Sequence, residues 1–233
     1  MRKIFWFLSS FNIDSPRNWG IESNVHLDIG CGLNPRNPFM APRLLAADIF
    51  PKTDFFKSSE FEYIQVKLTG EIPLPDESVD SISGFDFLEH LPRGSTIETN
   101  MFIKFMNEAS RVLKSGGVLF LVTPAFPSSA AFQDPTHVNF ISESTLNYFI
   151  GSNPGAKSLG YGFTGSFELL TQDWVGPLSK VWDESFIEVN GKGNKALELL
   201  TRLAHTIRSF SRARALLSSL RNPTHLLWLL RKT

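Results

Sequence analysis

The sequence predicts an α/β protein built on a doubly wound, mostly parallel sheet. Short apolar runs of the kind that form buried parallel strands recur along the chain. Helical or loop-rich stretches separate them, and this alternation is typical of parallel sheets covered by helices. With 233 residues, the chain is long enough for one such domain with embellishments.

Each predicted strand is a short apolar or alternating run. The fifth follows a helical pattern over 101–113 that ends at Gly116–Gly117, a glycine C-cap signal. Because prolines break helices, Pro35, Pro38 and Pro42 predict a loop or a single helical turn between the first two strands. The predicted strands are 25–29, 43–48, 61–67, 79–85, 118–123, 167–171 and 224–230.

The chain divides into five predicted parts of one domain. The C-terminal insertion contains an amphipathic, arginine-rich helix over about 194–221, for which three roles stay open. It covers the sheet, forms a homo-oligomer contact, or lies on an anionic membrane surface. The parts are an N-terminal lid or helix (1–23), a cofactor-binding half (24–124), acceptor-side loops with the sixth strand and a helix near 142–149 (125–190), a helical insertion (191–223) and the last strand (224–233).

Composition narrows the functional classes. Basic and acidic residues balance at 23 each, which argues against nucleic acid as the main partner because phosphate binding needs a basic field. The single cysteine, Cys31, excludes an internal disulfide and favours a reducing, cytoplasmic location. No stretch approaches the roughly 20 apolar residues of a membrane span. We predict no metal site.

The most informative motif ends the first predicted strand. Leu27-Asp-Ile-Gly-Cys-Gly32 combines an acid with a glycine turn that brings backbone N–H groups close to a ligand. Asp28 is placed to receive a cationic amine, and Asp48, ending the next strand, to hold ribose hydroxyls. A dinucleotide fingerprint needs a third glycine at position 35, where Pro35 stands. A nicotinamide oxidoreductase is therefore disfavoured.

These residues make the chain resemble the class I S-adenosylmethionine-dependent methyltransferases. The resemblance runs from about residue 24 to 124, and weakly to Phe167. It implies a Rossmann-like sheet of seven strands, the last antiparallel and inserted beside the fifth. The segments that carry it are 27–32, Ala47-Asp48, 72–80, Phe85-Asp-Phe-Leu-Glu-His-Leu91 and 108–123.

The resemblance also implies a cofactor site, with S-adenosylhomocysteine as the product. The methionine part would lie against Asp28, Gly30, Cys31 and Gly32, and the ribose against Asp48. The family's third glycine is Asn34 here, a residue that tolerates the left-handed region. The adenine would contact Ile49 and the backbone of Leu68 and Thr69, and the sulfonium Phe85 and Asp86.

Methyl transfer to oxygen usually needs a base, and histidine suits neutral pH. His90 lies in the resembling segment, and His137 lies in the polar loop after the fifth strand, where Asp134 is close enough in sequence to orient it. A structural role for either stays open, while His26, His205 and His225 are interpreted as structural or solvated. The 123–137 stretch resembles bacterial methyltransferases of surface-polysaccharide sugars, which implies a small-molecule or glycan acceptor.

Two functional hypotheses follow. The first is an O-methyltransferase that uses His137 or His90, with an acceptor pocket walled by several aromatic side chains. The second is a catalytically silent module that keeps the nucleotide pocket as a scaffold. The acids at 28 and 48 favour real cofactor binding. The aromatic side chains are Phe126, Phe132, Phe140, Tyr161 and Phe163.

Overall fold

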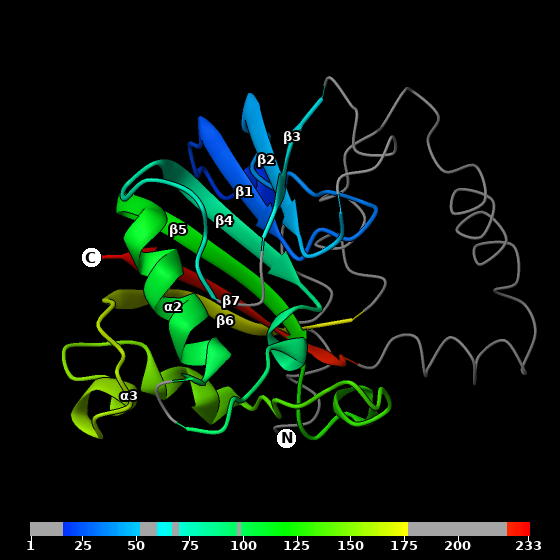
Figure 1. Cartoon of the computed structure of the whole chain (residues 1–233), viewed down its shortest axis with the longest axis vertical. Coiled ribbons are helices and arrows are strands. Elements are labelled where there is room, and N and C mark those ends of the chain that lie inside the picture. The colour runs from blue at the N-terminus through cyan, green and yellow to red at the C-terminus, as the bar shows by residue number, and fades with distance from the viewer. Residues whose placement is uncertain (1–15, 52–59, 67–69, 97–98, 177–222) are drawn as a thin grey trace, which may run out of the picture.

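The computed structural model describes residues 16–51, 60–66, 70–96, 99–176 and 223–233. They form one seven-stranded sheet in the order β3-β2-β1-β4-β5-β7-β6 (Figure 1). All neighbouring pairs from β3 to β5 are parallel, and β7 pairs antiparallel with both β5 and β6. The strands are β1 (Val25–Ile29), β2 (Arg43–Asp48), β3 (Glu62–Gln65), β4 (Val79–Phe85), β5 (Leu113–Pro124), β6 (Phe167–Val175) and β7 (His225–Lys232).

This topology confirms the predicted fold, including the antiparallel last strand beside the fifth. β1, β2 and β4 have the predicted bounds, and no helix lies between β1 and β2. The bounds of β5 differ from the prediction. Gly116 and Gly117 lie inside this strand and do not cap the helix, because the chain pairs with β4 from Leu113 onward.

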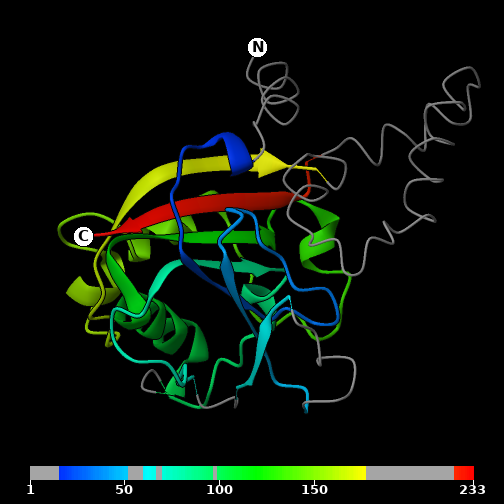
Figure 2. The ribbon, with the colours of Figure 1, turned by 90° about the horizontal axis from the view of Figure 1, so that it is seen from above.

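Helix α2 (Met101–Val112) covers one face of the sheet (Figure 2). It begins at Asn100, whose side chain accepts hydrogen bonds from two orphan N–H groups of the first turn. Its buried face packs on the inner side chains of β1, β4 and β5 in the larger core cluster. A smaller cluster on the other face gathers Phe39, Phe85 and Phe120, against which Trp19 packs after the 3₁₀ turn Pro16–Asn18.

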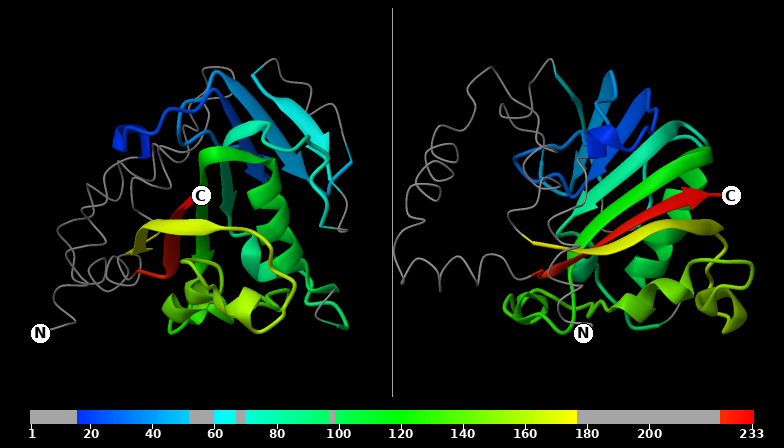
Figure 3. Two further views of the ribbon diagram at one scale, coloured as in Figure 1. Left: turned by 90° about the vertical axis from the view of Figure 1, so that its left-hand side faces the viewer. Right: turned by 180° about the vertical axis from the view of Figure 1, so that it is seen from behind.

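The segment between β5 and β6 returns the chain from the carboxyl end of β5 to the start of β6 (Figure 3). It contains the 3₁₀ turns Ser129–Ala131 and Glu143–Tyr148 and the short helix α3 (Gly155–Ser158). The predicted helix near 142–149 is thus a 3₁₀ turn. Among the described residues, no helix is long and apolar enough to cross a membrane.

Two predictions fall outside the described residues. The basic segment 194–221 lies within the undescribed stretch 177–222, and most of the predicted N-terminal lid lies within 1–15. The three roles weighed for the basic segment therefore stay predictions, and so does the single-domain division of the chain.

Candidate active site

The predicted cofactor site begins with a tight turn after β1. Gly30 and Gly32 both have positive φ, at 68° and 54°. At Gly30 a Cβ would lie 2.6 Å from the ring of Phe87, whereas at Gly32 it would meet open space. Glycine at both positions therefore satisfies the backbone conformation, and at Gly30 also the packing. Asn34 does not take up the left-handed region, so the turn needs only these two glycines.

Asp28 is buried at the end of β1, and both its oxygens are engaged within the chain. Oδ2 accepts a hydrogen bond from the N–H of Arg36 at 2.8 Å, and Oδ1 accepts one from the Ser83 hydroxyl at 2.6 Å. The side chain is 1% exposed. Asp28 thus fixes the loop that follows Gly32, and a direct contact with the methionine amine stays a prediction.

A buried polar chain leads from Asp28 into the sheet. Ser83 spends its only hydroxyl hydrogen on Asp28, so it accepts from Nε2–H of His26 at 2.9 Å. Nδ1 of His26 then accepts from the Ser81 hydroxyl at 2.6 Å. The chain forms because β1 and β4 pair with His26 opposite Ser81 and Asp28 opposite Ser83. We call these four residues the β1–β4 polar chain.

Burial shifts both titratable members of the β1–β4 polar chain. Desolvation raises the pKa of Asp28 to about 7, against the opposing effects of its hydrogen bonds and of Arg36. Desolvation also lowers the pKa of His26 to about 3, so this imidazole is neutral. Its complete burial and neutrality agree with the structural role expected for His26.

Asp48 ends β2, next to the glycine turn. Its Oδ2 accepts from the N–H of Gly32 and its Oδ1 from the N–H of Ile49, both at 2.7 Å. Each carboxylate oxygen retains a further lone pair for a ribose hydroxyl. Ile49 is exposed immediately beyond, as an adenine platform requires, while Leu68 and Thr69 lie outside the described residues.

Cys31, predicted to line the methionine part, is a buried free thiol. It lies 3.5 Å from the carbonyl oxygen of Gly32. Burial, together with Asp28 and Asp48 nearby, raises the pKa of this thiol well above its usual range. Cys31 is therefore a neutral packing group of the turn.

Two residues outside the predicted site lie at the predicted sulfonium end: Arg36, which sequence reasoning did not consider, and His225, which it interpreted as structural or solvated. The Arg36 guanidinium lies 4.0 Å from the ring centroid of Phe85, and Nε2 of His225 lies 3.0 Å from Oδ1 of Asp86. His225 reaches this edge because β7 runs antiparallel to β5, which pairs His225 with Pro124. A guanidinium here suits a carboxylate such as that of methionine.

His90 and His137, the two candidate bases, lie together. Their ring centroids are 4.8 Å apart, one ring edge-on to the other. The loop carrying His137 is tied to the 3₁₀ turn Leu88–His90, because the backbone oxygen of Glu89 accepts the N–H groups of Val138 and Asn139. The Asn139 side chain donates to two further carbonyls of the same turn region, at 2.9 and 2.6 Å.

The hydrogen bonds define which nitrogen of each imidazole carries the hydrogen. Thr136 donates its hydroxyl to Asp134 at 2.7 Å, so it accepts from Nδ1–H of His90 at 3.0 Å. Nδ1 of His137 faces the Ala131 carbonyl at 3.2 Å and must also carry hydrogen. Both Nε2 atoms therefore present lone pairs. The Asp134 carboxylate, expected to orient His137, instead orients His90 through Thr136.

Glu89 is the residue of this cluster that sequence reasoning missed. Its carboxyl is 1% exposed, and Oε2 accepts from the Thr123 hydroxyl at 2.9 Å. Burial raises its pKa to about 8. The signal available in the sequence was an acid next to a histidine with a leucine on either side of the pair, in Leu88-Glu-His-Leu91.

The predicted acceptor-side aromatics divide into two sets. Phe126, Phe132 and Phe140 are exposed, and the last two stack with ring centroids 5.2 Å apart. Phe163 is buried in the larger core, and Tyr161 packs against it. Only the first set is available to an acceptor.

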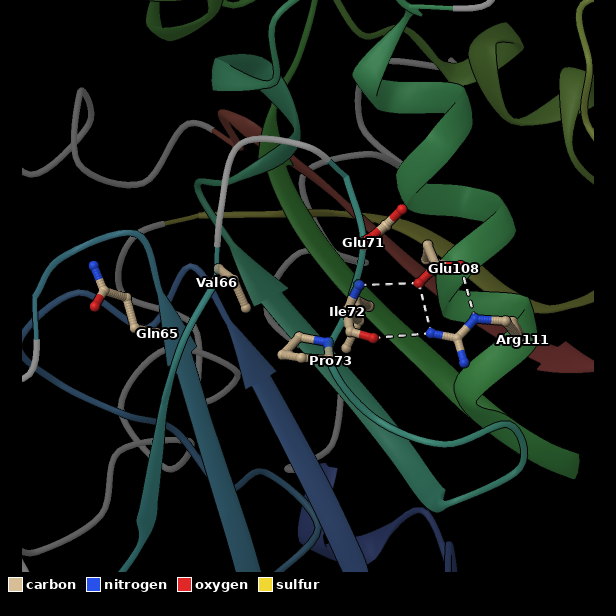
Figure 4. Close-up of a pocket in the computed structure, with 7 residues that line it drawn as sticks. All are labelled: Gln65, Val66, Glu71, Ile72, Pro73, Glu108 and Arg111. Carbon is tan, nitrogen blue, oxygen red and sulfur yellow. Dashed lines mark hydrogen bonds and ion pairs between the residues drawn. The ribbon is translucent and has the colours of Figure 1, made fainter.

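A cavity of about 480 Å³ lies apart from these residues, on the α2 side of the end of β3 (Figure 4). Glu108 accepts from the N–H of Ile72 and pairs with Arg111, which also donates to the Ile72 carbonyl. This bridge holds the β3–β4 connection on α2. Among the residues that the structure describes, none of the predicted cofactor residues lines the cavity; its described lining is Gln65, Val66, Glu71, Ile72, Pro73, Glu108 and Arg111.

Comparisons with known proteins agree with the fold. Residues 27–121 match the methyltransferase domain family. A chain in the complex between the Haloferax volcanii Trm112 methyltransferase activator and a methyltransferase superposes with a TM-score of 0.56, 12% identity, and coverage of 99% of this chain and 91% of that one. A sarcosine dimethylglycine methyltransferase from Galdieria sulphuraria superposes with a TM-score of 0.51 and 18% identity. The match covers 100% of this chain and 85% of that one. No curated protein sequence matches the chain.

The matched domain spans β1 to β5, which includes the glycine turn and both acids. Together with the sheet order, this match supports a methyltransferase enzyme with a Rossmann-like fold.

Proposed function

We propose that this methyltransferase transfers a methyl group from S-adenosylmethionine to a hydroxyl of a small-molecule or glycan acceptor. The observation that carries the proposal is the pair His90 and His137, each with an Nε2 lone pair, in the segments that follow β4 and β5. Ligands of open α/β sheets bind at this carboxyl edge.

The residues at the glycine turn fit the cofactor. Asp48 retains lone pairs beside a glycine with open space before it, and Ile49 offers an exposed apolar surface. Arg36 and Asp86 supply charges of both signs near Phe85, suited to the zwitterionic methionine end. When bound, S-adenosylmethionine supplies a methyl group already activated by its positively charged sulfur.

The protein's own task is then alignment and proton removal. An acceptor hydroxyl beside the histidines would lose its proton to an Nε2 atom as its oxygen bonds to the methyl carbon and the sulfur–methyl bond breaks, which would leave S-adenosylhomocysteine. Phe126, Phe132 and Phe140 provide exposed aromatic faces near the histidine loop, which suit the C–H faces of a sugar ring.

The test is transfer of a labelled methyl group to a panel of monosaccharides, nucleotide sugars, oligosaccharides, phenols and carboxylic acids. We expect product with a hydroxyl acceptor, and His137→Gln should lower kcat about 10²-fold or more with cofactor affinity retained. Glu168→Gln, at the opposite edge of the sheet, is the matched control.

Calorimetry separates this function from the silent-module hypothesis. Heat of binding with S-adenosylmethionine and S-adenosylhomocysteine is expected for the wild type and for His137→Gln. No binding of either nucleoside, or full turnover by His137→Gln, would contradict the proposal.

A further inference from the structure

The geometry points to a second binding site, which we propose takes a divalent cation of the zinc type on Glu89, His90 and His137. One ligand atom of each residue lies within 4.8 Å of those of the other two. The three residues come from two segments, the 3₁₀ turn after β4 and the loop after β5, which backbone hydrogen bonds hold together.

The two imidazoles are oriented as metal ligands are. A metal-binding histidine usually donates its second ring N–H to a carboxylate, a backbone carbonyl or a water molecule, which fixes the ring. Nδ1 of His137 donates to the Ala131 carbonyl, and Nδ1 of His90 donates to Thr136, which is held in turn by Asp134. Both Nε2 lone pairs remain for an ion.

Glu89 gives the independent observation. Its Oε1 atom is buried and has no hydrogen-bond partner, and Nε2 of His90 lies 3.9 Å from it. A buried carboxyl oxygen without a partner is costly whether or not the carboxyl carries a proton. A cation between Oε1 and the two Nε2 atoms supplies the missing partner for all three.

The donor set selects the kind of ion. Two imidazoles and one carboxylate are a known ligand set of catalytic zinc, and three protein ligands leave a coordination position open. Tetrahedral zinc needs ligand atoms about 3.3 Å apart, so distances of up to 4.8 Å in the cluster must shorten by up to about 1.5 Å. His90, whose side chain is 39% exposed, has room to rotate inward.

The role of the ion rests on the proposed function, although its binding does not. At the open position a zinc-type cation holds an acceptor hydroxyl and lowers its pKa. With the ion bound, the Nε2 atoms of His90 and His137 are its ligands and no longer act as bases. The lowered pKa of the hydroxyl replaces that role, and its proton leaves to solvent or buffer. Chelation would abolish methyl transfer without affecting cofactor binding.

Titration of the chelator-treated full chain with Co²⁺, followed by Zn²⁺ competition, tests the site without any cofactor. We expect a visible d–d absorption that saturates at one ion per chain and is lost on adding Zn²⁺. Glu89→Gln, His90→Gln and His137→Gln should each weaken binding more than 10-fold, whereas Glu168→Gln should bind as the wild type does.

Circular dichroism establishes that each variant is folded, and the exposed His90→Gln keeps the test decisive if Glu89→Gln does not fold. Absence of saturable binding, or binding unchanged in both histidine variants, would overturn the cation site. Neither result would touch the proposed methyltransferase function, which labelled methyl transfer by the untreated chain, with no chelator added, measures separately.

Discussion

Two buried carboxyls, Asp28 and Glu89, follow or end neighbouring strands of one sheet, yet their surroundings differ. Both are 1% exposed. Asp28 is satisfied at each oxygen by donors from the loop and from β4. Glu89 has one donor, Thr123, and one oxygen without a hydrogen bond. The difference indicates that Asp28 builds the fold around the glycine turn after β1, while one oxygen of Glu89 is left for the proposed ligand.

The largest expected effect is a pH dependence of the unfolding free energy in single variants of Asp28 and His26. In the folded chain Asp28 has a pKa of about 7 and His26 a pKa of about 3, whereas the same groups in water have pKa values of 3.8 and 6.5. Between about pH 4 and 6.5, the folded pair carries its proton on Asp28 and the unfolded pair carries it on His26. Because both states bind the same number of protons, this pair adds no pH dependence to the unfolding free energy of the wild type.

Single substitutions break that balance in opposite directions. In His26→Asn the raised pKa of Asp28 remains, so stability relative to wild type falls as pH rises from about 4 to 7. In Asp28→Asn the lowered pKa of His26 remains, so stability is lost as pH falls below about 6.5. Each slope approaches about 1.4 kcal/mol per pH unit, or about 3 kcal/mol over the window. Urea unfolding at several pH values measures it, and parallel profiles for the three proteins would contradict the linkage.

A matched amide exchange at the two carboxyls gives the next effect. In Asp28→Asn the new NH₂ group faces a donor, either the Ser83 hydroxyl or the Arg36 N–H, so we expect a loss of about 1–3 kcal/mol. In Glu89→Gln the NH₂ takes the place of an oxygen that no donor faces, and Thr123 keeps its acceptor. The expected change is within about 0.5 kcal/mol.

Urea unfolding at one pH, in the presence of chelator, compares the two variants. Equal losses would mean that Glu89 is held in the fold as firmly as Asp28, and the distinction between the two carboxyls would fail.

The sequence predicts the region around Asp28 better than the region around Glu89. Apolar runs indicate the strands and spacing indicates the glycine turn, so the predicted bounds of β1, β2 and β4 are confirmed. The β1–β4 polar chain was also accessible in principle. His26 and Asp28 alternate on β1 as Ser81 and Ser83 do on β4, so each pair faces one side of its strand.

The second region depends on tertiary contacts that spacing does not encode. Asp134 lies close to His137 in sequence, but its hydrogen bonds lead through Thr136 to His90. Glu89 becomes a ligand candidate only once the loop after β5 folds back on the turn after β4. The contact of Arg36 with Phe85 could not be predicted from spacing either, because it depends on the path of a proline-containing loop.

Asp48 is a third carboxyl to compare with these two. Like Asp28, it accepts a hydrogen bond at each oxygen, but it lies nearer the surface, with 7% of the residue exposed. Asp48→Ala should weaken S-adenosylmethionine binding by roughly 1–3 kcal/mol, because ribose hydrogen bonds and the anchor of Gly32 are lost together. Calorimetric titration measures the affinity, and Glu62→Gln, an exposed acid paired with Arg43, is the control. Unchanged affinity for Asp48→Ala would mean that the cofactor lies elsewhere.

The smallest expected effect tests whether the hydrogen bonds behind the three proposed ligands also support ion binding. Thr136→Val keeps the shape of the side chain but removes the acceptor for Nδ1–H of His90. Losing such an outer partner typically weakens metal affinity about 10-fold, so Co²⁺ should bind about 10-fold more weakly with cofactor affinity unchanged. Asp134→Asn, which keeps an oxygen acceptor for Thr136, should lose less. If Thr136→Val binds Co²⁺ as tightly as the wild type, the hydrogen bonds behind His90 serve the loop alone, and the resemblance to a metal site ends at the three side chains.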